Sequence, residues 1–394
     1  MSISYWLDRS SSSTMQRFDV VIVGAGISGL STAFWLEQED PQLKIVLVEK
    51  NRLGFGASGR NAGFVTCGSV EHFNRLIGKH GRDEAVEIWR FSETNLKLLE
   101  EHIIRGPGTH SPTDLLFEKK GSYSLAASEA EHDELKKVAQ TMDELKIPVQ
   151  VYNERELHQA VGTEGFCGGI RYKDDGAIHP HRLLEKIYSR LKNTTLLEGT
   201  EVSSYQSTGS GTRIVKTDAG LIETSMIVYA LNGYSTALNP YFKDKIYPTR
   251  GQALMMEKLD RFMDAPCYAN SYLDYFRQLP SGELLIGGFR QLEKATEVGF
   301  SDHTTDVIQN ALHDFVKKYL PRFKDKKVTH RWGGVMGFSA DGQPMVGSLP
   351  DDNHVFFLGG YTGHGMGLAF HTAKATVDMI YGREIPKWLS AKRF

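Results

Sequence analysis

Three glycines and one glutamate near the N-terminus have the spacing of a phosphate-binding turn. Gly24, Gly26 and Gly29 form the pattern G-x-G-x-x-G after the apolar run DVVIV, and Glu49 lies 20 residues beyond Gly29 at the end of the next apolar run. Gly24 would make the turn, Gly26 would admit a pyrophosphate, Gly29 would allow close helix–strand packing, and Glu49 could accept bonds from ribose hydroxyls. The helix N-terminus adds free N–H groups and partial positive charge. The pattern predicts a dinucleotide site rather than a purely structural glycine turn.

A second glycine-rich segment, residues 51–65 with the sequence NRLGFGASGRNAGFV, follows this unit. Its Ser58, Arg60 and Asn61 could hydrogen-bond phosphate or ring heteroatoms, and its small residues would let a flat ring lie against the backbone. An NAD domain would instead continue as repeated βαβ units. Taken alone, the segment fits the wall of a flavin site and a flexible surface loop equally well.

Hydrophobic spacing predicts the elements that position these residues. Residues 18–50 have the pattern of a βαβ unit. Apolar residues at helical spacing predict helices over 81–103 and 128–147, and the second opens on the capping pair Ser128 and Glu131.

The later part of the chain is richer in strand patterns. Residues 200–233 carry runs of β-forming residues between Gly and Asp turns, which predicts an antiparallel meander leading to a core strand. Residues 365–382 predict a helix that starts on glycines and ends at Gly382.

The composition is that of a globular protein with more than one domain. The 394 residues suggest two or three domains, and 46 Lys and Arg nearly balance 48 Asp and Glu, so no net field favours nucleic acid or an anionic membrane. The sequence contains neither an apolar run of about 20 residues nor a signal-peptide pattern. Cys67, Cys167 and Cys267 have no metal-binding spacing. We therefore expect a cytoplasmic protein with no membrane span, no nucleic-acid partner and no metal site.

Seven segments occur in the order found in FAD-dependent amine and amino-acid oxidases of the D-amino-acid oxidase and glycine oxidase type. They are VVIVGAGISGLSTAFWL, GFGASGRNAG, AIHPHRL, ALNGYS, PTRGQ, RWGGVMGFSADGQPMVG and GGYTGHGMG. Residues 15–382 thus resemble this family. Within it, GFGASGRN, HP after a glycine turn, YLDYFR, ELLIGG and GGYTGHG are most similar to the gamma-glutamylputrescine oxidase branch.

The resemblance implies an α/β (α+β) fold with two domains. A discontinuous, Rossmann-like FAD-binding domain of the glutathione-reductase type would comprise residues 1–88, 150–240 and 326–394. A substrate domain built on a mixed, mostly antiparallel sheet would comprise residues 89–149 and 241–325.

The resemblance also implies which residues contact FAD. Val202 would offer its backbone to the adenine, and the loop from Gly360 to Met366 would lie beneath the ring near N1 and the C2 carbonyl. The flavin would be noncovalent, because Gly334 stands where some members carry a linking cysteine. The implied cofactor contacts are Gly24, Ala25, Gly26, Ile27, Ser28, Gly29, Glu49, Lys50, Gly56, Ala57, Ser58, Arg60, Asn61, Ala62, Gly63, Val202, Asn232, Gly233, Gly360, Thr362, Gly363, His364, Gly365 and Met366.

The activity implied is oxidation of a C–N bond in a small amine or amine conjugate, such as a gamma-glutamyl polyamine. Hydride would pass from the substrate carbon to flavin N5, leaving an imine that hydrolyses. O2 or another acceptor would reoxidise FAD; the lysine that assists oxygen reduction in sarcosine oxidases corresponds to Leu285 here. A helix beginning near Gly365 would stabilise negative charge near N1. His364 could donate a proton, hydrogen-bond flavin or substrate, or only hold its loop.

Two carboxylate-binding positions of relatives lack a cation in this chain. Glycine-oxidase-like relatives place an arginine at the position of Met336, and sarcosine-oxidase-like relatives place a lysine at the position of Gly367. A carboxylate without a cationic partner is costly in a poorly solvated pocket. An amine conjugate is therefore favoured over a simple α-amino acid.

The candidate catalytic and substrate-side residues are aromatic, cationic or apolar: His364, Tyr361, Tyr275, Arg277, Trp332 and Met336. The aromatic residues Tyr275, Phe276, Trp332 and Tyr361 would either wall an aliphatic chain or pack in the core. Arg60, Arg277 and Arg290 could pair with an anionic substrate group, contact the cofactor or form surface salt bridges. Other possible functions are an amino-acid dehydrogenase or oxidase of the glycine oxidase type, a tRNA-modifying flavoprotein and a flavin-binding protein without turnover.

Overall fold

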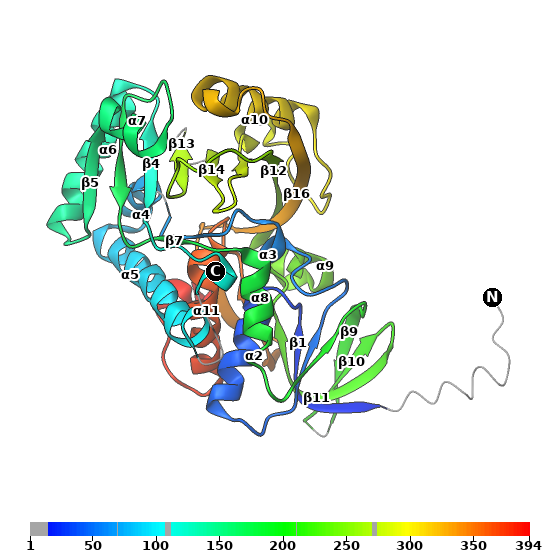
Figure 1. Cartoon of the computed structure of the whole chain (residues 1–394). Helices are drawn as coiled ribbons and strands as arrows, with labels where there is room; N and C mark the ends of the chain where they lie inside the picture. The colour runs from blue at the N-terminus through cyan, green and yellow to red at the C-terminus, as the bar shows by residue number, and fades with distance from the viewer. Residues whose placement is uncertain (1–14, 69, 107–111, 210, 270–273) are drawn as a thin grey trace.

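The computed structural model describes residues 15–68, 70–106, 112–209, 211–269 and 274–394. The first 14 residues, where the sequence has no signal-peptide pattern, lie outside this description, as do the first residues of the YLDYFR segment. The described chain forms two lobes, each built on an eight-stranded sheet (Figure 1). A two-stranded pair, β3 (Phe64–Val65) with β7 (Gly176–Ala177), is antiparallel.

The first sheet has the strand order β17-β18-β11-β1-β2-β8, with β10 and β9 continuing from β11. β1 pairs in parallel with β2 and β11, and the β9, β10 and β11 strands form the predicted antiparallel meander. Its strands are β1 (Gln16–Val23), β2 (Ile45–Val48), β8 (Thr194–Leu197), β9 (Val202–Ser207), β10 (Arg213–Thr217), β11 (Gly220–Tyr229), β17 (Met345–Leu349) and β18 (Asp352–Gly359). The run VVIV is fully buried, as expected for a parallel strand covered on both faces.

Helices of the first lobe pack around α11 (Gly365–Ile380). α2 (Ile27–Glu39) and α5 (Arg82–Leu99) both lie against it, and the Trp35 indole N–H donates to the Phe370 carbonyl at 3.0 Å. The predicted 81–103 helix is α5, whose end continues as a π-helical turn (Glu100–Ile104). Further helices are α3 (Ala57–Arg60), α4 (Val70–His80), α8 (Pro180–Tyr188) and α9 (Ser235–Leu238), with 3-10 turns at Pro112–Leu115, Asn232–Tyr234, Pro240–Phe242, Lys387–Leu389 and Ala391–Arg393.

The second sheet has the order β16-β12-β15-β14-β13-β4-β6-β5 and is antiparallel except for the parallel pair β13 with β4. Its strands are β4 (Ser122–Ala126), β5 (Val149–Asn153), β6 (Gly168–Tyr172), β12 (Ile246–Met256), β13 (Cys267–Ala269), β14 (Asp274–Gln278), β15 (Leu284–Gly287) and β16 (Val328–Ser339). Helices α6 (Glu129–Glu144), α7 (Glu154–Val161) and α10 (Asp306–Tyr319) cover it, and 3-10 turns lie at Arg290–Glu293 and Pro321–Phe323. The predicted mixed fold class is confirmed.

The sheets divide the chain differently from the predicted domain ranges. β5 and β6 lie within or beside the range 150–240, and β16 lies within 326–394, yet all three run in the second sheet. α5, mostly inside the range 89–149, packs against α11 in the first lobe. Strands join these sheets by pairing with segments that are distant in the sequence: β6 pairs with β4, with Ile170 opposite Ser124. Local sequence patterns do not identify such pairing partners.

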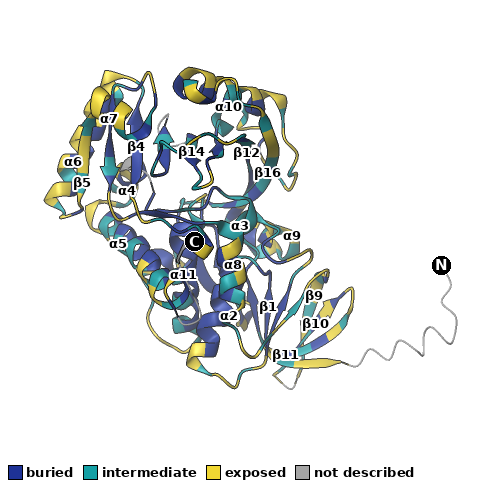
Figure 2. Cartoon of the chain, in the orientation of Figure 1, coloured by how far each residue is buried: buried dark blue, intermediate teal, exposed yellow. Residues whose placement is uncertain are grey.

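The buried residues lie mainly in the two sheets and along α2 and α11 (Figure 2). The outer faces of α6, α7 and α10 are exposed. Within the five described ranges, no helix combines the length and apolarity needed to cross a bilayer. The same ranges hold no group of three or more His, Cys, Asp or Glu side chains arranged to bind a metal.

Candidate functional site

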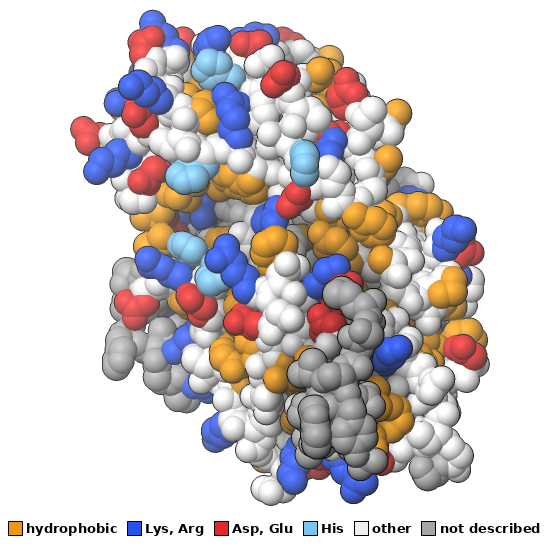
Figure 3. Space-filling model, turned by 90° about the vertical axis from the view of Figure 1, so that its right-hand side faces the viewer, with side chains coloured by type: hydrophobic (Ala, Val, Ile, Leu, Met, Phe, Trp, Pro, Cys, Tyr) orange, Lys and Arg blue, Asp and Glu red, His pale blue; other side chains and the backbone are white. Residues whose placement is uncertain are grey.

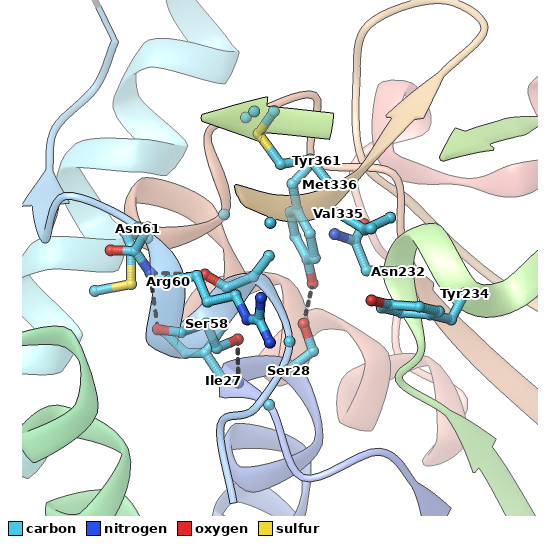
Figure 4. A pocket seen from close by; sticks show the side chains of 18 of the residues that line it. Ile27, Ser28, Ser58, Arg60, Asn61, Asn232, Tyr234, Val335, Met336 and Tyr361 are labelled. Atoms are coloured by element: carbon cyan, nitrogen blue, oxygen red, sulfur yellow. Dashed lines mark hydrogen bonds between the residues drawn. The ribbon is translucent and has the colours of Figure 1, made fainter. Parts of the chain in front are cut away.

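A cavity of about 550 Å³ lies between the two sheets. Its walls come from the turn after β1, the glycine-rich segment, the face of the second sheet and the loop before α11. Figure 3 shows hydrophobic side chains gathered between the two lobes on one face of the molecule, and Figure 4 shows the lining from close by.

The glycines of the first turn are required by close contacts. A Cβ on Gly26 would stand 2.9 Å from Ser58 Oγ, and a Cβ on Gly29 would stand 1.9 Å from the Gly24 carbonyl oxygen. The Ile27 N–H donates to that Ser58 Oγ at 2.9 Å, a bond drawn in Figure 4. The N-terminus of α2 thus faces the cavity with its first amides lacking intrahelical acceptors.

Glu49 is fixed at the end of β2 by two backbone amides. Its carboxylate accepts from the Ala25 N–H at 3.0 Å and from the Asn51 N–H at 2.9 Å. Both it and its neighbour Lys50, which pairs with Glu201 at 2.8 Å, line the cavity. A carboxylate oxygen has more than one lone pair, so Glu49 keeps capacity for a hydroxyl donor.

The glycine-rich segment is held against the second sheet by Arg60. Its guanidinium donates to the carbonyls of Phe55 at 2.9 Å and Gly333 at 2.8 Å, and pairs with Asp302 at 2.9 Å. The Trp332 indole N–H returns a bond to the Arg60 carbonyl at 2.8 Å. Of the two alternatives for this segment, the structure therefore shows an anchored cavity wall.

Asn61 organises the inside of the same segment. Its amide donates to the carbonyls of Ala57 at 3.0 Å and Ser58 at 2.8 Å, and its Oδ1 accepts from the Gly63 N–H at 2.7 Å. With these bonds made, Asn61 acts locally as a brace for the loop. Gly63 has φ 75°, and a Cβ there would stand 2.0 Å from the Ile178 carbonyl oxygen.

The face of the second sheet closes the other side of the cavity. Trp332, Gly334, Met336 and Phe338 alternate along β16 and all line the cavity. The aromatic rings of Phe64, Tyr268 and Tyr275 form a continuous wall, since Phe64 packs edge-on against Tyr268 at 5.3 Å and against Tyr275 at 5.7 Å. This wall is largely apolar.

Two hydrogen bonds tie the loop before α11 to the first lobe. The Tyr361 and Ser28 hydroxyls are hydrogen-bonded at 2.8 Å, and the Asn232 Oδ1 accepts from the Gly360 N–H at 3.0 Å. The first of these bonds is drawn in Figure 4. Tyr361 is buried, and burial raises the pKa of its hydroxyl. It therefore stays protonated and able to donate.

His364 lies at the start of α11 and stacks on His72 of α4, with ring centroids 4.1 Å apart and an interplanar angle of 21°. Burial lowers the pKa of His364 to about 4, and the charge of Arg75 adds to the effect. Its Nδ1 lies 3.0 Å from the Thr362 carbonyl, which can only accept. His364 is therefore neutral at pH 7, with Nδ1 protonated and the lone pair on Nε2.

Most predicted site residues line the cavity, and six do not. The residues that are not part of the lining are Ala25, Gly29, Gly63, Gly233, Gly360 and Arg277. Those that line it are Gly24, Gly26, Ile27, Ser28, Glu49, Lys50, Gly56, Ala57, Ser58, Arg60, Asn61, Ala62, Val202, Asn232, Tyr275, Trp332, Met336, Tyr361, Thr362, Gly363, His364, Gly365 and Met366. Phe276 is fully buried in the core of the second lobe.

Arg277 is the candidate catalytic residue that the structure sets apart. It follows Tyr275 by two positions on β14, so it points to the same side of the sheet but roughly 7 Å further along. Its guanidinium donates to the Ile178 carbonyl at 2.9 Å, and burial lowers its pKa to about 10.

Several cavity residues were not singled out from the sequence. They are Phe64, Thr66, Arg75, Tyr234, Gln252, Tyr268 and Phe338. Only Phe338 carried a usable signal, because it shares the two-residue period of Trp332 and Met336. The others reach the cavity through sheet pairings or helix packing that the sequence does not reveal.

The cavity fits a dinucleotide that carries a flat ring system. One end holds an open glycine turn, a helix N-terminus and Glu49, and a Cβ on Gly56 would meet no atom within 4 Å. The other end is a slot between the aromatic wall and the loop before α11. A family model described as FAD dependent oxidoreductase matches residues 19–379.

The chain belongs to this FAD-dependent oxidoreductase family. The protein is thus an oxidoreductase with FAD as its cofactor. Curated relatives include the probable oxidoreductase OrdL of Haemophilus influenzae, 25% identical over 93% of this chain and 84% of that protein. Gamma-glutamylputrescine oxidoreductase of Escherichia coli is 24% identical over 92% and 84%, and glycine oxidase of Bacillus subtilis is 24% identical over 96% and 97%.

Solved structures of other proteins share the fold. Glycine oxidase from Geobacillus kaustophilus superposes with a TM-score of 0.78 at 22% identity, covering 94% of this chain and 96% of that one. Iminodiacetate oxidase from Chelativorans sp. BNC1 gives 0.76 at 17% identity, covering 94% and 99%.

Proposed function

We propose that this oxidoreductase oxidises a C–N bond of a small amine or amine conjugate. The observation that carries the proposal is a cavity lined by the aromatic wall of Phe64, Tyr268 and Tyr275 and by a neutral His364. Bound FAD supplies a two-electron acceptor for the hydride of the carbon next to nitrogen, and the resulting imine hydrolyses. The names of the relatives, which include an oxidoreductase of gamma-glutamylputrescine and oxidases of glycine and sarcosine, support the same bond type.

The lining residues of the first lobe would hold the cofactor. The N-terminus of α2 suits the pyrophosphate, Glu49 suits the ribose, and Val202 lies at the same end of the cavity. At the other end, the first amides of α11, at Gly365 and Met366, are donors for negative charge on the ring.

The substrate side would favour an unprotonated amine, whose lone pair is needed to stabilise the developing cation. A slot walled by Phe64, Tyr268 and Tyr275 disfavours an ammonium ion by desolvation. His364 presents an acceptor Nε2 and carries no charge at neutral pH, so it can orient an N–H without repelling a cation.

Attachment of FAD would be noncovalent. None of the three cysteines is among the described residues that line the cavity, and a side chain on Gly334 would begin 3.2 Å from Arg60 Cβ. Acid precipitation of the holoprotein should therefore leave the yellow colour in the supernatant.

Simple α-amino acids would be poor substrates. Met336 offers no charge to a carboxylate, and a Cβ on Gly367 would stand 2.0 Å from the Thr66 carbonyl oxygen, which leaves no room for a lysine there. We favour conjugates such as gamma-glutamyl polyamines, with O2 or another electron acceptor as the oxidant.

Anaerobic mixing tests this function. The holoprotein is mixed with alkylamines, polyamines, gamma-glutamyl amines and α-amino acids while flavin absorbance is followed. Bleaching by an amine or a conjugate, but not by glycine, is expected; bleaching by simple α-amino acids alone would refute the proposal. Repeating the best case in air with peroxide detection distinguishes an oxidase from a dehydrogenase.

A further inference from the structure

The charges that line the cavity are unbalanced. Among the described lining residues there are four cations, Lys50, Arg60, Arg75 and Arg290, and two acids, Glu49 and Glu201. Lys50 is paired with Glu201, Arg60 with Asp302, and Arg75 donates to His72 Nδ1 at 2.8 Å. Both acids lie at the nucleotide end. Among the described lining residues, the wall formed by the second sheet thus has a cation and no acid.

Arg290 provides that charge. Its guanidinium lies over the Phe338 ring, 4.8 Å from the centroid, and the structure records no carboxylate within ion-pair distance of it in the described chain. Phe338 shares the cavity face of β16 with Met336, two residues away. Stacking on a ring covers one flat face of a guanidinium and leaves its N–H edge free for a bidentate acceptor. Burial lowers the pKa of Arg290, and the charge of Glu297, a carboxylate already paired with Arg250 at 2.6 Å, offsets this effect only in part. An anion beside Arg290 would further stabilise its charge.

The backbone before Arg290 is built to hold it in this place. Gly288 has φ 134° and Phe289 has φ 59°, a left-handed conformation that is uncommon for a bulky residue. The Phe289 N–H donates to the buried Asp274 carboxylate at 2.6 Å, and its ring packs edge-on against Phe315 at 5.8 Å. This anchored turn aims the following side chain at the cavity.

We propose that Arg290 binds a carboxylate carried by the amine substrate. The inference rests on the proposed function and narrows it to amines that bear a carboxylate on a tail extending along β16. Arg290 is then a specificity-determining residue, while the apolar wall at Tyr268 and Tyr275 receives the reacting end.

Binding of compounds that cannot be oxidised tests the site separately from turnover. The holoprotein is titrated with hexanoate and with hexanamide, followed by visible flavin absorbance and by calorimetry. We expect hexanoate to bind at least tenfold more tightly than hexanamide, R290M to lose this preference, and R290K to keep part of it. R322M is the matched control, because Arg322 also follows a turn and stacks on a ring, that of Phe262 at 4.3 Å, outside the cavity.

Three results would overturn the inference: no hexanoate binding by calorimetry, equal binding of hexanoate and hexanamide, or an unchanged hexanoate Kd in R290M. If R290M loses its flavin, the hexanoate preference of R290K is the deciding measurement, because lysine keeps the positive charge but not the bidentate geometry of the guanidinium. Anaerobic reduction by 4-aminobutanoate against butylamine then connects the site to turnover. If no amine reduces the flavin, the proposed function is refuted. The inference about Arg290 would still stand if the wild type prefers hexanoate and R290M does not.

Discussion

The Tyr361 hydroxyl lies 2.8 Å from the Ser28 hydroxyl and joins the loop before α11 to the first turn of α2. These two segments are 333 residues apart in the sequence, and both contribute to the cavity wall. One buried hydrogen bond thus couples the part of the site suited to phosphate with the part suited to the ring.

Removing this bond should weaken both stability and FAD retention. In Tyr361→Phe the buried Ser28 hydroxyl loses a partner, which we expect to cost about 1–2 kcal/mol in the free energy of unfolding. Urea unfolding of the holoprotein and the flavin-to-protein absorbance ratio measure the two effects. Tyr247→Phe is the control, since Tyr247 is exposed and bonds only a surface carbonyl. Equal stability of the two variants would contradict the prediction.

Gly26→Ala should abolish FAD binding while leaving the fold intact. The added methyl would stand 2.9 Å from Ser58 Oγ, which must then move away from the Ile27 amide and into the phosphate end of the cavity. Gly78→Ala is the matched control, because Gly78 lies in α4 with no atom near an added Cβ. It should gain up to about 1 kcal/mol from helix propensity and keep its flavin. The ratio of flavin absorbance at roughly 450 nm to protein absorbance at roughly 280 nm measures how much flavin each variant retains.

Local chemistry made the nucleotide end of the site predictable. The three glycines lie in one contiguous strand, turn and helix, so the whole motif can be seen in the sequence. The helix at 129–144 was equally predictable, since Ser128 Oγ accepts from the Glu131 N–H as expected. The Glu131 carboxylate accepts from the Ala127 N–H rather than from the Ser128 N–H of a complete capping box.

The residues at the ring end of the cavity were harder to predict, because strand pairing and helix packing between distant segments bring them there. Tyr268 reaches the cavity through a parallel pairing of β13 with β4, and Arg75 through packing of α4 beside α5. Arg277 is a contrasting case: its charge suggested a role in the site, and the structure places its guanidinium on the Ile178 carbonyl, so a catalytic role stays a prediction. Residue type alone cannot tell these cases apart.

Met336→Arg should raise activity toward simple α-amino acids. Met336 lines the cavity beside Gly251, whose missing side chain leaves room, and its Cε stands 2.8 Å from where a Gly251 Cβ would lie. A guanidinium there could bind an α-carboxylate in a bidentate manner. We expect at least a tenfold rise in flavin reduction by glycine or sarcosine relative to the best amine. Met336→Leu, which conserves volume, should change neither rate by more than a few-fold, and no gain in a flavin-loaded Met336→Arg protein would count against the placement of the substrate.

Stability should fall in mild acid, and His371 should account for a measurable part of the loss. Burial lowers the pKa of His371 to about 4; its Nδ1 lies 3.0 Å from the Phe91 carbonyl and its ring stacks on Phe91 at 3.7 Å. Because the folded-state pKa lies below the unfolded value of about 6.5, only the unfolded chain takes up a proton between these values. Stability is therefore full above about pH 6.5 and falls toward pH 4, by up to about 1.4 kcal/mol per pH unit.

His371→Gln isolates this contribution, since glutamine can still donate to the Phe91 carbonyl but does not titrate. Urea unfolding of both proteins from pH 4.5 to 7.5 should show a shallower acid loss in the variant, whatever its stability at pH 7.5. Asp175, whose pKa burial raises to about 7, gives a slope of opposite sign, but it is present in both proteins and cancels in their difference. Parallel curves for His371→Gln and the wild type would show that His371 has the same pKa in the folded and unfolded chains, contrary to its burial.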